Sequence, residues 1–305
     1  VLKLTRAGTD AAQNYFELAL EKDPYYAPAY AGIAFAWAAR RQMGFLPAKE
    51  AGEKQREAAI KALALDDTCA EAHFAIAAVM GWSDWNWKGA EMEFLRTIQL
   101  DPQYALAHAY YSHILAIIGR FDEAVFHMER ALELDPYNAL FHSLNAGVLN
   151  FLERYDEAET AGRTALSLQT DLPTGRSQLG LALRELGKYD EVLAMQRERA
   201  SNDPELIAAL EKGFAEAGYK GAQQHMADVQ AARYGKPDGV RAITIAGMYF
   251  DAGNLALALD WFERAYEVHE PNLPYLGRPY WNPLRSKPRF QELLQKMNVP
   301  ISTLR

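Results

Sequence analysis

The chain of 305 residues is half apolar and carries a formal net charge of −8. Its charge is spread without a basic stripe, which argues against a nucleic-acid partner. No apolar run approaches the roughly 20 residues that a helix needs to cross a membrane, so we expect no membrane span. The single cysteine, Cys69, excludes an internal disulfide and fits a reducing compartment such as the cytoplasm. Because the chain begins at Val1 rather than at methionine, we expect it to be part of a longer protein.

The first predicted element is a helix within residues 1–24. Its apolar residues follow helical spacing from Ala12 onward, and the pattern stops at Asp23-Pro24. A residue before proline is pushed away from helical geometry, and proline itself suits the first turn of a following helix. We therefore expect one unpaired helix in residues 1–24.

Beyond this helix, one sequence phrase recurs with a period of 34 residues. In the unit from Ala105 to Asn138, the first helix has one apolar stripe, and Gly119 follows it where a left-handed C-cap is needed. A fixed period of this length predicts stacked helical hairpins that bury one continuous core. The small residue near the start of the second helix recurs at Ala90, Ala124, Ala158 and Val192.

These residues resemble the tetratricopeptide repeat, in which large apolar residues, a glycine, a tyrosine, two alanines and a proline stand at fixed positions. The resemblance covers nearly the whole chain and implies an all-α, right-handed superhelical solenoid of helical hairpins with a C-terminal capping segment. We expect seven hairpins in residues 25–272, and a proline-rich cap with a final helix in residues 273–305. The expected hairpins are Ala27–Asp67, Ala70–Pro102, Ala105–Asn138, Ala139–Leu172, Pro173–Asp203, Pro204–Asp238 and Gly239–Asn272.

Three segments depart from the repeat. The first hairpin contains an insertion at residues 42–54, the second contains Trp82, Trp85 and Trp87, and residues 271–288 hold five prolines. A repeat array needs an atypical element to cover its last apolar face, so we expect the end of the chain to act as a cap. We expect the tryptophan cluster to support the neighbouring insertion, with contact to a partner as the alternative.

A narrower resemblance rests on the same departures. It is carried by residues 81–91 (Gly-Trp-Ser-Asp-Trp-Asn-Trp-Lys-Gly-Ala-Glu), 261–266 (Trp-Phe-Glu-Arg-Ala-Tyr) and 282–290 (Asn-Pro-Leu-Arg-Ser-Lys-Pro-Arg-Phe). These segments are similar to the C-terminal region of a bacterial signalling group. In that group a tetratricopeptide array follows a winged-helix, nucleotide-cyclase or kinase domain, often through a TolB-like region. None of these output domains lies in the present sequence, so no activity of theirs is carried over.

The histidines are the first candidates for a metal site. Three of them, His73, His108 and His142, stand at the same position of successive units. Neighbouring helices lie about 8–10 Å apart, whereas zinc–nitrogen bonds are about 2 Å long, so we expect packing instead of a shared ion. His113 and His127 lie on opposite helices of one hairpin, where they could meet, but without a third ligand. We expect no metal and no cofactor.

Catalytic signals are equally weak. Acidic pairs such as Asp122-Glu123 recur because each begins a second helix, where carboxylates stabilise the positive end of the helix dipole. Cys69 has no identifiable histidine partner, and the glycine-rich residues 213–221 lack the lysine and hydroxyl residue of a phosphate-binding loop. We therefore expect no catalytic residues and no enzyme activity.

The tetratricopeptide resemblance also implies which residues face the concave side. The clamp that family members use for a C-terminal carboxylate is absent, because Ala31, Phe35, Phe74 and Ala109 stand where it needs lysine and asparagine. What remains is an aromatic front half and a rear half of mixed charge. The alternative for these aromatic residues is packing against one another or against the insertion. The expected peptide-binding residues are Phe35, Phe74, Trp82, His113, Asn150, Phe151 and Arg184.

The sequence thus predicts a protein-interaction or sensory module that binds a peptide or protein segment in its concave groove. An amphipathic helix or an extended apolar peptide would suit the aromatic half. One alternative is a small-molecule sensor coupled to an output domain outside this chain. Another is a scaffold that forms homo-oligomers through its final helix or aromatic face.

Overall fold

The structure is a computed structural model that describes residues 5–236 and 239–300. Every regular element in these residues is a helix, and the helices follow one another as hairpins, which confirms the all-α solenoid fold. The N-terminal half comprises α1 Arg6–Lys22, α2 Ala27–Met43, α3 Ala48–Leu65, α4 Ala70–Trp82, α5 Trp87–Leu100, α6 Ala105–Ile117, α7 Phe121–Leu134 and α8 Ala139–Phe151. The C-terminal half comprises α9 Tyr155–Leu168, α10 Pro173–Glu185, α11 Tyr189–Arg199, α12 Pro204–Arg233, α13 Ala242–Asp251, α14 Leu255–Glu267, the 3₁₀ helices η1 Leu273–Gly277 and η2 Pro279–Leu284, and α15 Pro288–Lys296.

Glycine and alanine shape the hairpins in the way that the period indicates. Gly119, between α6 and α7, has a φ of 81°, which a residue without Cβ adopts without strain. Ala124 and Ala158, near the starts of α7 and α9, are fully buried where the two helices of a hairpin meet. A larger side chain at these positions would push the helices apart.

The insertion in the first hairpin lengthens helices instead of forming a loop. Helices α2 and α3 have 17 and 18 residues, whereas α6 and α7 have 13 and 14. Only residues 44–47 form the turn, and Gly44 ends α2 in the left-handed conformation with a φ of 71°. The first hairpin is therefore longer than its neighbours.

The sixth unit is the least regular one. Its two arms form the continuous element α12, which is kinked at Ala217 and Gly218. The arms approach so closely that a Cβ on Gly213 would lie 2.2 Å from the carbonyl oxygen of Gly221. Gly213 and Gly221 therefore serve the packing of the two arms, and Gly218 allows the kink with its φ of 62°.

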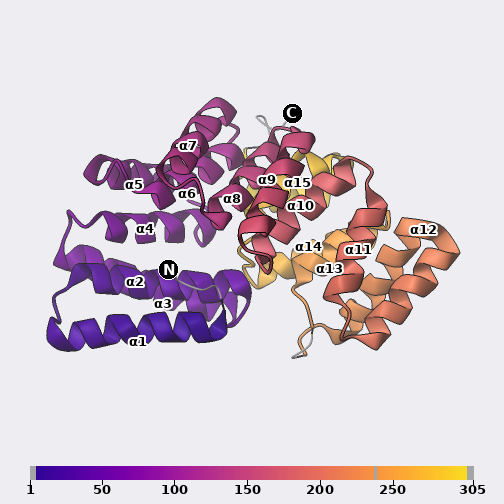
Figure 1. Cartoon of the computed structure of the whole chain (residues 1–305), viewed down its shortest axis with the longest axis horizontal. Helices are drawn as coiled ribbons and strands as arrows, with labels where there is room; N and C mark the ends of the chain where they lie inside the picture. Colours follow the sequence, from indigo (N-terminus) through magenta and orange to yellow (C-terminus); the bar gives the residue numbers. More distant parts are fainter. Residues whose placement is uncertain (1–4, 237–238, 301–305) are drawn as a thin grey trace.

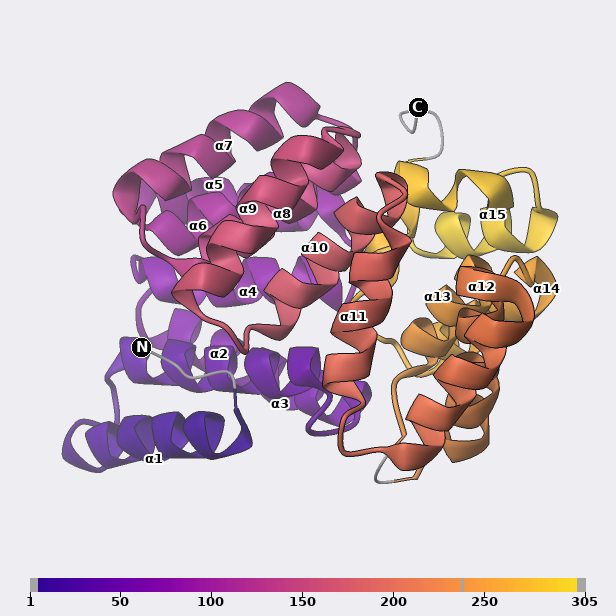
Figure 2. The ribbon, with the colours of Figure 1, turned by 45° about the vertical axis from the view of Figure 1, so that its right-hand side comes forward.

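The end of the chain returns to the middle of the molecule. Figure 1 shows α1–α3 at one end of the long axis and α12 at the other, with the yellow C-terminal segment between them. In the turned view of Figure 2, α14 and α15 lie next to each other. Leu273 and Leu276 of η1 and Leu284 of η2 belong to the same buried cluster as residues of α4–α8 and α13–α15. The residues that follow α14 thus join the two halves of the array. No helix in the described part of the chain is long and apolar enough to cross a membrane.

Candidate functional site

Three helices of the N-terminal half direct side chains at Tyr275, a residue of η1. The Tyr275 hydroxyl lies 3.0 Å from Nδ1 of His113 on α6. The indole N–H of Trp82, the last residue of α4, donates a hydrogen bond to the same hydroxyl. The ring of Phe151, at the end of α8, lies 6.1 Å from the Tyr275 ring, centroid to centroid. Segments far apart in sequence therefore form one site around this tyrosine.

Hydrogen bonding fixes the tautomer of His113. Its Nε2 lies 2.9 Å from the carbonyl oxygen of Leu144, which can only accept, so Nε2 carries the proton. Nδ1 is then the acceptor for the Tyr275 hydroxyl. Burial, assisted by the positive charge of Arg278, lowers the pKa of His113 to about 3, so the imidazole stays neutral at physiological pH. The result is a continuous chain of hydrogen bonds from Trp82 to the backbone of α8.

A second residue of the C-terminal segment, Arg278, enters the same region. Its guanidinium lies 5.0 Å from the Phe151 ring centroid and 4.7 Å from that of Tyr275. Gly147 makes room for it, because a Cβ there would lie 3.4 Å from Nη2 of Arg278 and 2.9 Å from Cε1 of His113. Arg278 is buried, and its Nε and Nη2 hydrogen-bond no protein atom. Burial lowers its pKa to about 10, and no carboxylate contributes to that shift.

Most of the predicted groove residues are buried in the structure. Among them, Phe74, Trp82, His113, Asn150 and Phe151 are at most 7% exposed. Phe74, Trp82 and Phe151 are therefore packed in the interior, and Tyr275 of η1 lies against His113 and Phe151. Whether these residues bind a partner remains a prediction.

The other predicted residues lie beside this site. Phe35 of α2 is half-buried, and its ring centroid lies 6.1 Å from that of Phe74. Phe74 packs further into the α4–α5–α6 core, 5.9 Å from the ring of Phe94. Asn150 donates a hydrogen bond to the carbonyl oxygen of Gln178 on α10 at 3.1 Å, which ties two units together. These three residues pack within their own units or tie neighbouring units together.

Arg184 meets the C-terminal segment at a second place. Its Nε lies 3.6 Å from Oδ2 of Asp251 at the end of α13, and its guanidinium lies 5.4 Å from the ring centroid of Tyr280. The hydroxyls of Tyr280 and Tyr219 donate hydrogen bonds to the two oxygens of Asp251. A half-buried cation, a buried carboxylate and two phenols thus fasten η2 to the fifth, sixth and seventh units.

The tryptophan cluster holds the same end of the chain, which corrects part of the expectation that it supports the insertion. Trp85 stacks on His269, with ring centroids 4.9 Å apart. The indole N–H of Trp87 donates to the carbonyl oxygens of Met297, at 3.1 Å, and Asn298, at 2.8 Å. Their neighbour Ser83 contacts Arg41, which precedes the insertion in the lengthened first hairpin. Aromatic rings of this size reach past the hairpin, and the segment after α14 covers them.

The three register-equivalent histidines have a structural task. Nε2 of each one lies near a carbonyl oxygen six residues earlier, at 2.9 Å for His73, 3.3 Å for His108 and 2.8 Å for His142. They therefore fasten the turn that precedes each helix. His127 meets His108, Nδ1 to Nδ1 at 2.8 Å, whereas His113 turns toward Tyr275. Among the described residues no group of three or more histidine, cysteine, aspartate or glutamate side chains could hold a metal ion.

Cys69 offers no reactive thiol. It is buried at the start of α4, and its Sγ contacts the carboxylate of Glu71. Burial raises the pKa of the thiol to about 11, so the thiolate is scarce at neutral pH. The residue behaves as a small apolar group.

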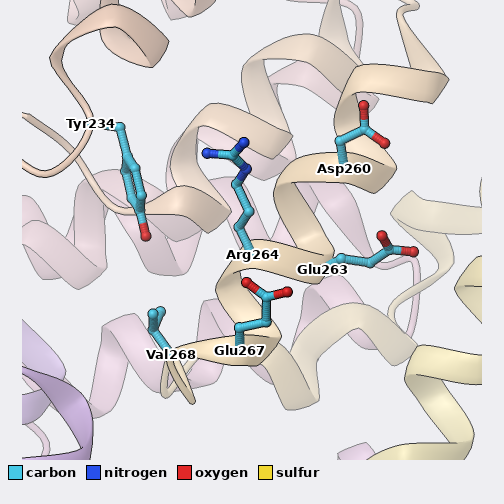
Figure 3. A pocket seen from close by; sticks show the side chains of 6 residues that line it. All are labelled: Tyr234, Asp260, Glu263, Arg264, Glu267 and Val268. Atoms are coloured by element: carbon cyan, nitrogen blue, oxygen red, sulfur yellow. The ribbon is translucent and has the colours of Figure 1, made fainter.

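The surface of the described residues is hollowed beside this site and along α14. The larger hollow, of about 470 Å³, is shallow and lies along the outer face of α14, with Tyr234 opposite (Figure 3). Two of its carboxylates, Asp260 and Glu263, already pair with Arg289 at 2.7 and 2.6 Å. The smaller, of about 140 Å³, lies between the start of α7, the end of α8 and η2, beside Phe151.

Comparison with known proteins agrees with this architecture. The model of the tetratricopeptide repeat family matches residues 105–138, whereas no curated protein matches the chain. A tetratricopeptide repeat protein from Parabacteroides merdae aligns over 93% of this chain and 98% of its own, with 12% identity and a TM-score of 0.50. A chain of the APC/C hetero-tetramer Cut9–Hcn1 aligns over 93% of this chain and 46% of its own, with 15% identity and a TM-score of 0.50. PilF of Pseudomonas aeruginosa aligns over 82% and 95%, with 16% identity and a TM-score of 0.44.

The fold is that of a tetratricopeptide-repeat solenoid. Residues 105–138, which form α6 and α7, are the unit that matches the family model. The same unit supplies His113, so a recognisable repeat lies at the centre of the site.

Proposed function

We propose that this chain is a protein-interaction module whose concave face recognises a peptide segment. The observation that carries this proposal is the convergence of Trp82, His113 and Phe151 on Tyr275. All three side chains stand at repeat positions that line the concave side of tetratricopeptide arrays. The concave face thus binds a short segment already, and that segment belongs to the same chain. Phe35, Phe74, Asn150 and Arg184 complete the proposed binding surface.

The site contains polar groups at defined positions, which suits it to bind a peptide; a purely apolar core would lack them. Trp82 and His113 offer one hydrogen-bond donor and one acceptor to the same hydroxyl. Phe151 offers a flat ring to a guanidinium, and Gly147 leaves space for it. A few placed polar groups among aromatic walls are what gives a ligand site its specificity.

Peptide display tests this proposal. The double variant Tyr275→Ala, Arg278→Ala lacks the two side chains that fill the site. It would be used to select peptides from a random library. Selected peptides should lose at least tenfold in affinity when Trp82→Phe or Gly147→Ala is added to that variant. Peptides that bind all of these variants equally would contradict a concave binding site. Circular dichroism and thermal unfolding of each variant keep loss of folding apart from loss of binding.

A further inference from the structure

The part of the C-terminal segment that enters the concave face is one short turn. Its backbone closes where the N–H of Arg278 donates to the carbonyl oxygen of Tyr275 at 3.2 Å. In a 3₁₀ turn, side chains three residues apart lie above one another. Tyr275 and Arg278 therefore enter the site as a pair, while Leu273 and Leu276 point as a second pair into the core. Pro274 and Pro279 bracket the turn and reduce its freedom before it binds.

The site selects for both members of this pair. The hydroxyl of Tyr275 accepts a hydrogen bond from the indole N–H of Trp82 and donates one to Nδ1 of His113, which phenylalanine cannot do. The cation lies near the faces of two aromatic rings, 5.0 Å from the centroid of Phe151 and 4.7 Å from that of Tyr275, where a weakly hydrated guanidinium is favoured over a lysine ammonium. No carboxylate contributes to the pKa of Arg278, so the site holds the cation through the aromatic rings and not through an ion pair.

Resting on the proposed function, we infer that the concave face is specific for a turn with tyrosine and arginine three residues apart, and that residues 273–284 are a built-in mimic of it. The partner is a peptide or protein segment that carries this pair beside a leucine. Such a segment would bind after the internal turn withdraws as a loop, with α14 and α15 remaining in place as its ends.

The apolar side chains of the internal turn are fully packed, whereas some of its buried polar atoms lack a hydrogen-bond partner. Leu273, Leu276 and Leu284 are buried, and their burial stabilises the closed form. In contrast, two nitrogens of Arg278, Nε and Nη2, are buried without a hydrogen-bond partner. A segment that supplied an acceptor to its own arginine in that place would recover an interaction that the closed form lacks.

Because the internal turn is tethered to the site, it lowers the apparent affinity of a free peptide that competes for the same place. A short tether holds its ligand at an effective concentration in the millimolar range. A free peptide with the same contacts and an intrinsic Kd of about 10 μM would then bind the wild-type chain about 100-fold more weakly than a chain without the internal pair. The internal turn therefore keeps the site closed to weak ligands.

The test uses a fluorescent peptide of residues 272–285 and measures anisotropy. The wild-type chain should bind it at least tenfold more weakly than the variant with Tyr275→Ala and Arg278→Ala. For that variant, peptides with Tyr→Phe or Arg→Lys at the paired positions should bind at least fivefold more weakly than the parent peptide. A chain with Tyr275→Phe and Arg278→Lys serves if the alanine variant does not fold.

Each outcome separates this inference from the proposed function. If the substituted peptides bind the emptied site as tightly as the parent peptide, the specificity for the pair is wrong, although the concave site stands. If the parent peptide fails to bind while display-selected peptides bind, the pair is not what the site recognises. If neither kind of peptide binds a folded variant, both proposals fall. Equal affinity of wild-type and emptied chains would show that the internal turn does not compete.

Discussion

His113 and Tyr275 are hydrogen-bonded at 3.0 Å although 162 residues separate them in the sequence. One belongs to the unit that matches the family model, and the other to the segment that follows the last hairpin. The other contacts of the array are mostly between neighbouring helices. The contact of His113 with Tyr275 instead joins the third hairpin to the C-terminal segment.

Removing the Tyr275 hydroxyl tests that contact. Tyr275→Phe would leave the Trp82 N–H and Nδ1 of His113 buried without their partner, which costs about 1–3 kcal/mol. Urea unfolding should show this loss in the free energy of unfolding. Tyr137→Phe, at a position that is 82% exposed, is the matched control and should change the free energy by less than about 0.5 kcal/mol. Equal stability of both variants would contradict the hydrogen-bond chain.

Acid should destabilise the protein in part through His113. The unfolded chain takes up a proton on this residue near its ordinary pKa of 6.5, whereas burial lowers the folded pKa to about 3. Stability therefore does not depend on this group above pH 6.5, and it falls as pH decreases from 6.5 toward 3, by up to about 1.4 kcal/mol per pH unit.

The measurement is urea unfolding at several pH values between 7 and 5, for the wild-type chain and for His113→Gln. The variant should lose stability less steeply, by about one proton taken up on unfolding. His127, whose pKa burial lowers to about 4, contributes a slope of the same sign to both proteins and so cancels in the comparison. Identical slopes would mean that His113 is free to ionise in the folded chain.

Two glycine substitutions should have opposite effects. A Cβ at Gly147 would lie 2.9 Å from Cε1 of His113, so Gly147→Ala must displace that ring and should cost about 1–3 kcal/mol. Gly180 lies in the interior of α10, and a Cβ there would lie 3.9 Å from the nearest atom, Nη1 of Arg184. Gly180→Ala should therefore stabilise by up to about 1 kcal/mol through helix propensity. Thermal unfolding checks both signs. A stabilising Gly147→Ala would mean that His113 does not pack there.

The ion pair between Arg184 and Asp251 should be important for attaching η2. Asp251→Asn removes the charge that faces a largely buried guanidinium, and loss of one partner from a buried pair costs about 3–5 kcal/mol. Because the Arg184 side chain keeps 23% exposure, we expect the lower end of this range in urea unfolding. Glu133→Gln, which breaks the exposed pair with Arg130, should leave stability unchanged. Similar effects of the two substitutions would rule out a special role for the buried pair.

The repeat itself was predictable from sequence because its causes are local. A turn glycine, a small residue at the helix crossing and an Asp-Pro stop each act within a few residues, so positions such as Gly119 and Ala124 locate the hairpins. The 34-residue period also identified His73, His108 and His142 as structural. Their hydrogen bonds to carbonyl oxygens six residues earlier could not be foreseen from spacing alone.

The site was only half predictable because it is made by a long-range contact. Repeat positions pointed to Trp82, His113 and Phe151, but nothing local to them indicates Tyr275 or Arg278. The available signal was a tyrosine and an arginine three residues apart between Pro274 and Pro279, in a segment too rich in proline for a long helix. Its place against α6 and α8 depends on the curvature of the whole array, which accumulates over many units.

Hydrogen exchange at the C-terminal segment tests most directly whether the chain fills its own concave face. The amides of Tyr275, Arg278 and Trp281 donate hydrogen bonds within the two 3₁₀ turns. If the turns are held as described, these amides should exchange at least about 100-fold more slowly than an unstructured peptide, and Tyr275→Phe should speed their exchange without affecting α6 to the same extent. Exchange of residues 273–284 at the rate of an unstructured peptide, in a chain whose helices α4–α8 remain protected, would contradict a filled concave face.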